Sequence, residues 1–323
     1  MNKIDIQPIV KNILLFVVFV FLIAMIIWIL GWFFGSLYSF FEKKVTLNQQ
    51  NFLAGLQKAP VLENLLPYRN WQVEDLKIDA ESAISVETDL LVQKKVLFKK
   101  NETKVLPTAS LVKLMTALVV LDNYNLQQQI TITGEDILQE GEQGDLKAGQ
   151  IFSVKNLLYM ALIESSNDAA FAISSAIGQD NFVALMNIEA KNLGLLNTYF
   201  KDSSGLDAGS YSTAKDLVQL AEHLLNKYPL VWQIMGLKEY DLYLDNGQFH
   251  HKLINTNKLL GEIPEVLGGK TGFTNYAKGT FLVVQKSPNK DNYLMHVILG
   301  SEDRLEEMKK IINWINIAYN WQL

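Results

Sequence analysis

The segment TASLVKLMTA, residues 108–117, combines two kinds of information in one short stretch. Its apolar residues recur at helical spacing and predict a buried helix over 108–122. Ser110 and Lys113 stand three residues apart, a spacing that brings two side chains together on one helix face. A serine hydroxyl becomes nucleophilic when a base removes its proton, and a lysine with a lowered pKa can be that base. The segment therefore predicts either a nucleophile with its base or two polar residues near a helix start.

The Ser-x-x-Lys pattern is weak evidence by itself, because the chain contains it three times, ending at Lys113, Lys215 and Lys290. A second pattern, Ser-x-Asn at residues 165–167, falls in a break between two predicted helices, where a hydroxyl and an amide can point into a cleft. It is also weak alone, since residues 287–289 repeat it. These two patterns gain weight only in combination with a third.

The third pattern, Lys-Thr-Gly at residues 270–272, occurs once and is predicted at the start of a strand. It offers an ammonium, a hydroxyl and an open backbone edge, to which an extended substrate could pair as an added strand. Ser-x-x-Lys, Ser-x-Asn and Lys-Thr-Gly, in this order, are the motifs of penicillin-binding proteins and related β-lactamases.

On these residues the chain resembles the serine D-alanyl-D-alanine carboxypeptidases, the low-molecular-weight penicillin-binding proteins of peptidase family S11. The resemblance extends over roughly residues 78–320. It includes the segments LKAGQIFSVKNLLYMALIESSNDAAFAIS, SSGLDAGSYSTAKDL, NTNKLL and GGKTGFTNYAKG.

The resemblance implies catalytic roles for the matching positions. Ser110 would attack the carbonyl between two D-alanines and form an acyl-enzyme, with Lys113 as its general base. Ser165 would relay a proton to the leaving amine. Asn167 would hold a substrate carbonyl and help to fix Lys113.

The resemblance also implies substrate-binding roles for the Lys-Thr-Gly strand. Lys270 would supply positive charge and help to relay protons, Thr271 would bind the terminal carboxylate, and Gly272 would leave the strand edge open. The backbone N–H of Phe273, with that of Ser110, would form the oxyanion hole.

Arginine is rare in the chain, which contains only Arg69 and Arg304. Arg304 is predicted near the start of the last helix, over 302–321, where the family uses an arginine to bind the substrate carboxylate. A guanidinium matches a carboxylate in a bidentate way. The alternative is a surface arginine paired with Glu306 or Glu307.

Predicted strands lie at both ends of the domain, over 82–88, 94–100 and 271–300, with predicted helices between them. This order indicates a mixed α/β layer fold rather than a doubly wound one. The resemblance implies a β-lactamase/transpeptidase-like fold, in which an antiparallel sheet is flanked by helices and accompanied by a helical subdomain.

Residues 13–34, ILLFVVFVFLIAMIIWILGWFF, contain no charged residue. About 20 apolar residues cross a bilayer core, and this run is longer than the apolar region of a signal peptide. We predict a cytoplasmic segment at 1–12, one transmembrane anchor at 13–36, a juxtamembrane spacer at 37–71 and the peptidase domain at 72–323.

Charge does not fix the orientation of the anchor, because lysines lie on both sides of it. The resemblance implies a single-pass cell-membrane protein whose catalytic domain faces peptidoglycan outside the membrane. It also implies stem peptides ending in D-Ala-D-Ala as substrates and β-lactam antibiotics as inhibitors.

Composition excludes several other chemistries. The chain has no cysteine, which removes thiol catalysis and cysteine-bound zinc, and its four histidines form no HExxH motif. The formal net charge is −5 without a long basic run, so nucleic acid is not expected as a partner. No metal or organic cofactor is expected.

Three alternatives stay open at this point. A D,D-endopeptidase could use the same site on cross-links. A β-lactamase would need a deacylating glutamate, and Glu222 to Asn226 match the E-x-x-L-N pattern, although Glu222 is predicted within an amphipathic helix over 213–227. A non-catalytic penicillin-binding sensor or scaffold is disfavoured because Ser110 and Lys113 are both present.

Overall fold

The computed structural model describes residues 67–90, 94–141, 144–289 and 291–321, together with Met25 and Gly31. The chain divides into Met1–Asn64 and Leu65–Leu323, and of the first unit only the helical residues Met25 and Gly31 are described. The anchor predicted at 13–36 otherwise lies outside the described residues. Among the described residues, no helix has the length and apolar character needed to cross a membrane.

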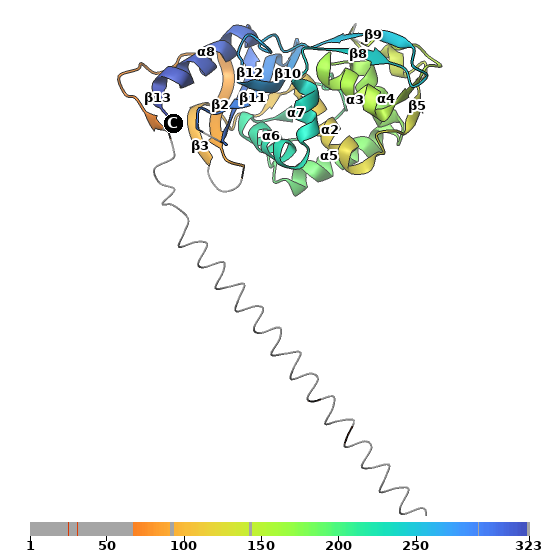
Figure 1. Ribbon diagram of the computed structural model, residues 1–323, viewed down its shortest axis with the longest axis horizontal. Coiled ribbons are helices and arrows are strands. Elements are labelled where there is room, and N and C mark those ends of the chain that lie inside the picture. The colour runs from red at the N-terminus through yellow and green to blue at the C-terminus, as the bar shows by residue number, and fades with distance from the viewer. Residues whose placement is uncertain are drawn as a thin grey trace, which may run out of the picture. The chain divides into compact units, whose positions relative to one another are not determined.

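The described part of the second unit is mixed α/β (Figure 1). Its strands are β1 Tyr68–Arg69, β2 Ala80–Thr88, β3 Lys94–Lys100, β4 Leu106–Pro107, β5 Gln129–Thr131, β6 Ile151–Ser153, β7 Tyr211–Ser212, β8 Glu239–Tyr243, β9 Phe249–Ile254, β10 Val266–Thr274, β11 Lys278–Lys286, β12 Tyr293–Ser301 and β13 Tyr319–Asn320. Its helices are the 3₁₀ turns η2 Ala109–Leu111 and η3 Asp136–Leu138, and α2 Val112–Asn123, α3 Val154–Ile163, α4 Asn167–Ser175, α5 Gln179–Asn192, α6 Ala214–Lys227, α7 Pro229–Met235 and α8 Arg304–Ala318.

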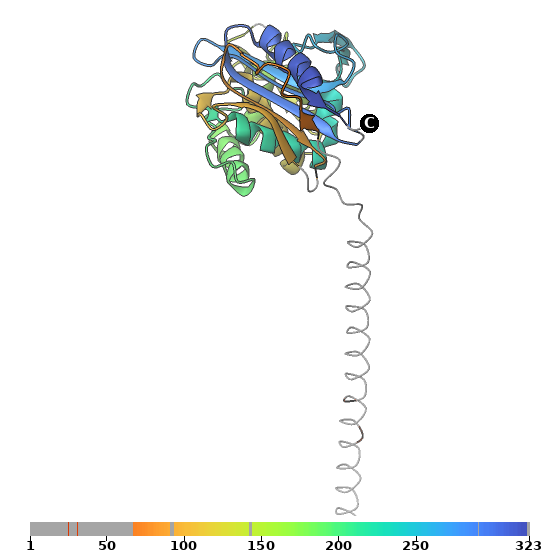
Figure 2. The same cartoon turned by 90° about the vertical axis from the view of Figure 1, so that its left-hand side faces the viewer.

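The central sheet is antiparallel and has the strand order β10-β11-β12-β2-β3. Side chains alternate between its two faces, so Leu282 and Val284 of β11 enter one core while Phe281 and Val283 enter the other. Helix α8 covers the second face, and α2 and α6 cover the first (Figure 2). Both faces are therefore buried, and β10 and β3 are left as the two edges of the sheet.

The helix predicted over 108–122 begins as the 3₁₀ turn η2 and becomes α-helical at Val112. Every residue of α2 from Val112 to Val120 is buried, which explains its apolar sequence. The helix predicted over 213–227 forms as α6, which Thr213 caps by accepting a hydrogen bond from the Asp216 backbone, and Ser153 caps α3 in the same way by accepting from the Asn156 backbone.

Three features differ from the sequence-based expectation. Lys-Thr-Gly lies in the middle of β10, which begins at Val266, and not at the start of a strand. Pro229, which follows the helix predicted over 213–227, occupies the first turn of a further helix, α7, that was not expected. Helix α5 and the β8–β9 hairpin were not expected at all.

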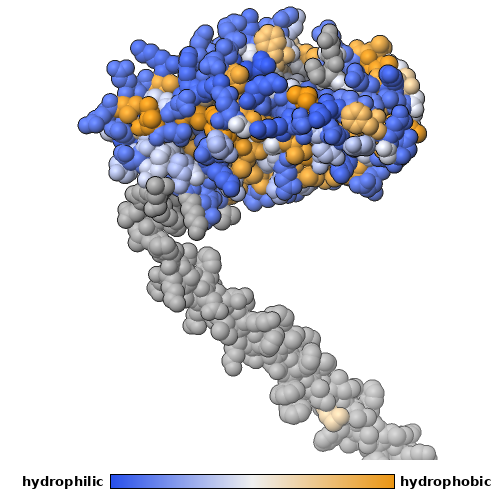
Figure 3. Space-filling view, turned by 45° about the horizontal axis from the view of Figure 1, so that its top comes forward, coloured by the Kyte–Doolittle hydropathy of each residue, from blue (hydrophilic) through white to orange (hydrophobic). Residues whose placement is uncertain are grey.

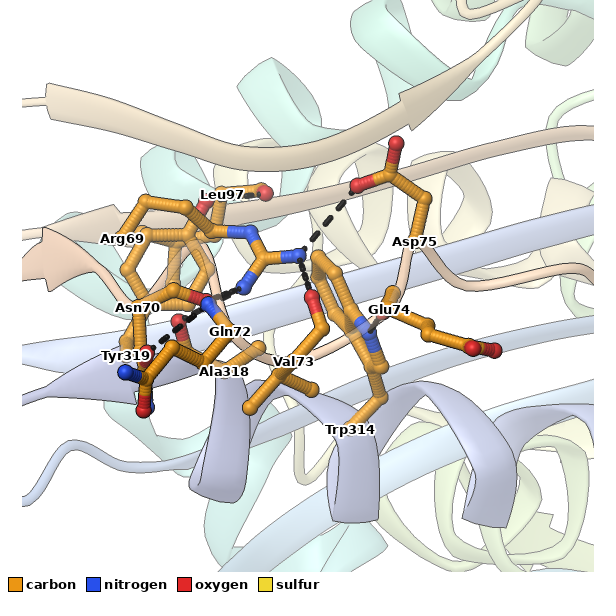
Figure 4. Close-up of polar contacts among 10 residues, drawn as sticks. All are labelled: Arg69, Asn70, Gln72, Val73, Glu74, Asp75, Leu97, Trp314, Ala318 and Tyr319. Carbon is orange, nitrogen blue, oxygen red and sulfur yellow. Dashed lines mark hydrogen bonds and ion pairs between the residues drawn. The ribbon is translucent and has the colours of Figure 1, made fainter.

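The two ends of the described body are joined. Tyr68 and Arg69 of β1 pair with β13, and the Arg69 guanidinium donates to the carbonyls of Val73 at 2.7 Å and Ala318 at 3.2 Å (Figure 4). The Trp314 indole N–H donates to the Glu74 carbonyl at 2.8 Å. Residues 68–71, placed in the spacer by composition, thus pack against α8 and β13.

Candidate active site

Ser110 is held in the 3₁₀ turn η2 by close backbone packing. The preceding Ala109 has a positive φ of 48°, and Thr280 of β11 donates its hydroxyl to the Thr108 carbonyl at 3.0 Å. Gly205, at φ 89°, lies so close that a Cβ there would be 2.0 Å from the Ala109 carbonyl oxygen. The turn that presents Ser110 is therefore fixed from two other segments of the chain.

Lys113 is fully buried one helical turn after Ser110. Its Nζ lies 3.0 Å from Ser110 Oγ, 2.6 Å from Asn167 Oδ1 and 2.8 Å from the Ser204 carbonyl. Burial lowers the pKa of Lys113 to about 7, although the nearby Asp202 carboxylate acts in the opposite direction. A neutral amine that donates its two N–H groups to Asn167 and Ser204 leaves its lone pair for the Ser110 hydroxyl.

Ser165 and Lys270 form a second contact in the same site. Ser165 lies between α3 and α4 at φ 71°, and Lys270 Nζ donates to its Oγ at 2.7 Å. Lys270 is also fully buried, and burial, with the nearby positive charges of Lys113 and Arg304, lowers its pKa well below the ordinary value. Two buried lysines therefore approach two serine hydroxyls.

Ser166, the middle residue of Ser-x-Asn, has a structural task. Its backbone φ of −53° requires no glycine, and its hydroxyl caps α4 by accepting from the Ala169 N–H at 3.1 Å. This cap aligns the first residue of α4, Asn167, toward Lys113. The serine found here, where the resembled family often has glycine, is therefore compatible with the site.

The edge strand β10 passes directly beside Ser110. A Cβ on Gly272 would lie 2.8 Å from the Ser110 backbone nitrogen and 2.5 Å from Thr280 Oγ1, so only glycine allows this approach. Phe273, the next residue, is 55% exposed, and within the described residues β10 has β11 as its one strand partner. The free edge of β10 is thus open to an extended ligand next to the nucleophile.

A small cavity of about 210 Å³ adjoins this edge. Thr271, Thr256 and Arg304 contribute to its lining, and the Thr271 hydroxyl donates to Thr256 Oγ1 at 2.7 Å. The Arg304 guanidinium lies 5.9 Å from the centre of the Phe273 ring. The cavity offers hydroxyl and guanidinium donors that suit a carboxylate.

Arg304 does not form the ion pair considered as the alternative. Among the described residues, Glu306 pairs with Lys309 at 3.3 Å and Glu307 pairs with Lys310 at 2.5 Å. Arg304 enters no ion pair in that set, and its burial lowers its pKa from the ordinary value.

Comparisons with known proteins agree with this geometry. Residues 69–303 match the model of the D-alanyl-D-alanine carboxypeptidases, Peptidase_S11. The chain belongs to peptidase family S11. It is 32% identical over 257 residues to the D-alanyl-D-alanine carboxypeptidase DacF of Bacillus subtilis, which covers 77% of this chain and 64% of the relative. The chain therefore spans less than two thirds of that relative's length.

Two further proteins, one compared by sequence and one by structure, are also similar to the chain. A D-alanyl-D-alanine endopeptidase of Escherichia coli is 32% identical over 231 residues, covering 68% of this chain and 73% of the relative. The crystal structure of a D-alanyl-D-alanine carboxypeptidase from Mycobacterium tuberculosis superposes with a TM-score of 0.69 at 27% identity, covering 79% of this chain and 99% of that one. The predicted mixed α/β fold with an antiparallel sheet is confirmed.

Sequence reasoning did not identify several residues of this S11 site. The Ser204 carbonyl is the third partner of Lys113, and Thr256 contacts Thr271. Asp202 organises the loop that delivers Ser204, because its Oδ2 accepts from the backbone N–H groups of Gly205 at 2.9 Å and of Leu206 at 2.7 Å. The segment SSGLDAGSYSTAKDL resembles the family, but the sequence does not indicate which of its backbone carbonyls contacts Lys113.

Glu222, the candidate deacylating residue, lies on α6 as predicted and accepts from Lys94 of β3 at 2.7 Å. Strand β3 is the opposite sheet edge from β10, four strand spacings or about 19 Å away. Because Glu222 is paired with Lys94 at the far edge of the sheet, it is too distant to activate a deacylating water at Ser110, which lies beside β10.

Proposed function

We propose that the chain is a serine D,D-carboxypeptidase that removes the terminal D-alanine from peptidoglycan stem peptides, and that penicillin acylates it. The observation that carries the proposal is the buried Lys113 amine, held between Ser110 Oγ, Asn167 Oδ1 and the Ser204 carbonyl. Such an amine can be neutral near pH 7 and can take the hydroxyl proton of the nucleophile.

Acylation follows from this arrangement. Lys113 accepts the Ser110 proton while Oγ bonds to the carbonyl carbon of the penultimate D-alanine. The resulting oxyanion is stabilised by the backbone N–H groups of Ser110 and Phe273, and loss of one such donor typically costs about 3–4 kcal/mol. Ser165, hydrogen-bonded to Lys270, passes a proton to the leaving D-alanine amine as the C–N bond breaks, and the proton that Lys113 took from Ser110 replaces it.

Deacylation releases the shortened peptide. A water molecule adds to the ester carbon while neutral Lys113 takes one of its protons, and the ester bond to Ser110 Oγ then breaks. Lys113 lies within hydrogen-bond distance of Oγ and returns that proton to it, which restores both the base and the nucleophile. The enzyme returns to its starting state without a metal or organic cofactor.

The cavity lined by Thr271 and Arg304 supports a substrate with a carboxylate next to the scissile bond. A terminal D-alanine supplies one. The D-centre of a diamino acid in a cross-link supplies one as well, and one relative is named an endopeptidase. Incubation with a stem pentapeptide and a cross-linked dimer in competition separates the two activities: faster release of D-alanine supports the carboxypeptidase, and faster dimer cleavage supports the endopeptidase.

The first test of the chemistry is intact-mass spectrometry of the full chain in detergent after mixing with benzylpenicillin. We expect an adduct on the parent chain and none on Ser110→Ala or Lys113→Ala. Lys215→Ala, which changes the exposed lysine of another Ser-x-x-Lys pattern, is the matched control and keeps the adduct. Drug destruction without an adduct would instead favour a β-lactamase, and an intact drug without an adduct would favour a scaffold.

We further propose that residues 13–36 anchor the chain in the cell membrane with the peptidase domain on the extracytoplasmic face. The support is the uncharged run at 13–34 and the location of peptidoglycan outside the membrane. Because the chain has no cysteine, Asn246→Cys and Asn2→Cys give unique labelling sites in the domain and at the N-terminus. An impermeant maleimide should label Asn246→Cys in intact cells and Asn2→Cys only after lysis; the reverse pattern would overturn the orientation.

A further inference from the structure

We propose that a surface remote from the active site, formed by Tyr68, Trp71, Lys95, Lys99 and Trp314, docks onto an anionic lipid bilayer. We call it the basic aromatic surface. The inference rests on the proposed function, because the bilayer is taken to be the one that residues 13–36 would span.

The basic aromatic surface surrounds an open cavity of about 920 Å³. The cavity lies where β3, β13 and α8 meet, and this is the sheet edge opposite the substrate-facing strand β10. In Figure 1 this corner is on the left, beside the C-terminal end. A partner bound here would leave the entrance to the active site free.

Two aromatic side chains of this surface are exposed to water and do not belong to the core of the domain. Trp71 is 83% exposed and Tyr68 is 56% exposed. Trp71 is nevertheless held in place, because the Arg69 guanidinium lies 5.5 Å from its ring centre and 4.7 Å from that of Trp314. On the face drawn in Figure 3, most of the described surface is hydrophilic, with hydrophobic patches among the hydrophilic residues. Trp and Tyr with one polar end are the residues that bilayer interfaces favour.

The polar groups inside the cavity are already used within the protein (Figure 4). Arg69 donates to backbone carbonyls and pairs with Asp75 at 3.2 Å, the Trp314 N–H donates to Glu74, and the Tyr319 hydroxyl donates to Leu97. A sugar chain is recognised by aromatic faces together with several free, convergent hydrogen-bonding groups. What this surface offers is aromatic rings and ammonium groups, which fit lipid headgroups better than a glycan.

The charge of the surface is opposite to that of the whole chain. Its cavity is lined by Arg69, Lys95 and Lys99 against a single carboxylate, Asp75, on a chain whose formal net charge is −5. Lys100 adds a further positive charge on the same strand, β3, whereas Lys99 is partly neutralised by Glu102 at 3.2 Å and Lys94 is paired with Glu222 on the other face of the sheet. An anionic leaflet attracts lysines near its surface by about 1 kcal/mol each, which corresponds to roughly a fivefold change in partitioning.

The chain enters the described body at this surface. The described body begins at Pro67, whose carbonyl accepts a hydrogen bond from Lys95 Nζ. Docking would therefore hold the domain where its own chain arrives, with β10 directed away from the bilayer.

The test uses the full chain in lipid nanodiscs. Gln72→Cys places a unique nitroxide label beside Trp71, and Asn246→Cys, in the β8–β9 turn on the opposite side of Figure 1, is the control. Electron paramagnetic resonance compares label collisions with oxygen, which partitions into lipid, and with a water-soluble nickel chelate. We expect the Gln72→Cys label to enter the lipid in discs containing phosphatidylglycerol, and the Asn246→Cys label to stay in water.

Two matched lysine substitutions test whether the positive charge of this surface causes the docking. In the Gln72→Cys background, Lys99→Gln should lower the docked-to-undocked ratio about fivefold, whereas Lys147→Gln, an exposed lysine outside this surface, should leave it unchanged. Trp71→Ala should return the label to water. Raised salt should weaken docking, since surface charges are screened over about 8–10 Å.

Each other outcome overturns the proposal. A chain that does not enter nanodiscs refutes the anchor and therefore the docking. A chain that enters, with both labels equally in water, refutes docking alone. Equal immersion in discs of pure phosphatidylcholine refutes charge attraction as its cause, and Trp71-dependent binding to purified sacculi with no lipid immersion assigns the surface to a glycan instead.

Discussion

The buried position of Lys113 predicts a pH dependence for the acylation of Ser110. Only the neutral amine can take the hydroxyl proton, so acylation should rise with pH through the pKa of Lys113, which burial lowers to about 7. The sign follows from the base: its protonated form is inactive, and activity is gained as the proton leaves.

The size of the effect follows from that pKa. At pH 5.5 about 3% of Lys113 would be neutral, and at pH 8.5 about 97%, which gives roughly a thirtyfold increase in the acylation rate. A lysine with its ordinary pKa of 10.5 would be neutral in about 1% of molecules at pH 8.5 and in only about 0.001% at pH 5.5, so its rate would still be climbing above pH 9.

The assay is stopped-flow measurement of the second-order rate of acylation by a fluorescent penicillin from pH 5.5 to 9.5. His251 is a second titratable group, and its hydrogen bond to Glu164 raises its pKa from 6.5. His251→Gln is therefore the control, and the inflection near pH 7 should persist in it. A flat profile, an inflection above pH 9, or its loss in His251→Gln would refute Lys113 as the neutral base.

Three further outcomes are expected. Arg304→Gln should lower kcat/KM for a peptide with a free terminal carboxylate by about 10–100-fold, since a hydrogen bond to a charged group contributes about 1.5–3 kcal/mol; an equal loss on a C-terminally amidated peptide would contradict carboxylate binding. Gly272→Ala should slow penicillin acylation by about 10²-fold or more, because its Cβ would lie 2.8 Å from the Ser110 nitrogen in the proposed oxyanion hole; an unchanged rate in stopped flow would argue against that hole. Glu164→Gln should lower the melting temperature most at acidic pH: the ion pair raises the folded-state pKa of His251, so its stabilisation is complete below the unfolded value of about 6.5 and is lost as pH rises through the folded-state pKa. Thermal unfolding at pH 5.5 and 8.5 measures this, and an equal deficit at both would rule out the ion pair as its source.

Local patterns predicted the elements whose causes are local. The segment KKVLFKK forms β3 at the predicted residues 94–100, and the helix predicted over 213–227 forms α6 after its Thr213 cap. Alternation and capping depend on near neighbours along the chain, so the sequence contains their full cause. The motif residues Ser110, Lys113 and Asn167 were likewise expected together, and the structure places them in contact.

The start of β10 depends on a distant partner and was missed. Residues 266–269, VLGG, contain two glycines, which weaken a strand, yet pairing with β11 includes them. Helix α5 had a usable signal that was overlooked, because its buried residues Phe182, Met186 and Ala190 follow one another at intervals of four. The Ser204 carbonyl could not have been found, since every residue carries one.

The β1–β13 pairing has a consequence for how such a domain can be tethered. The chain enters and leaves the described body side by side, at Tyr68 and Asn320. A membrane tether joined to either end of the described body would therefore attach at the same corner and would leave the catalytic face in the same orientation. The tether could be moved from one end to the other without a change in the core. The two ends could likewise be joined and the chain opened at an exposed turn, which is a circular permutation.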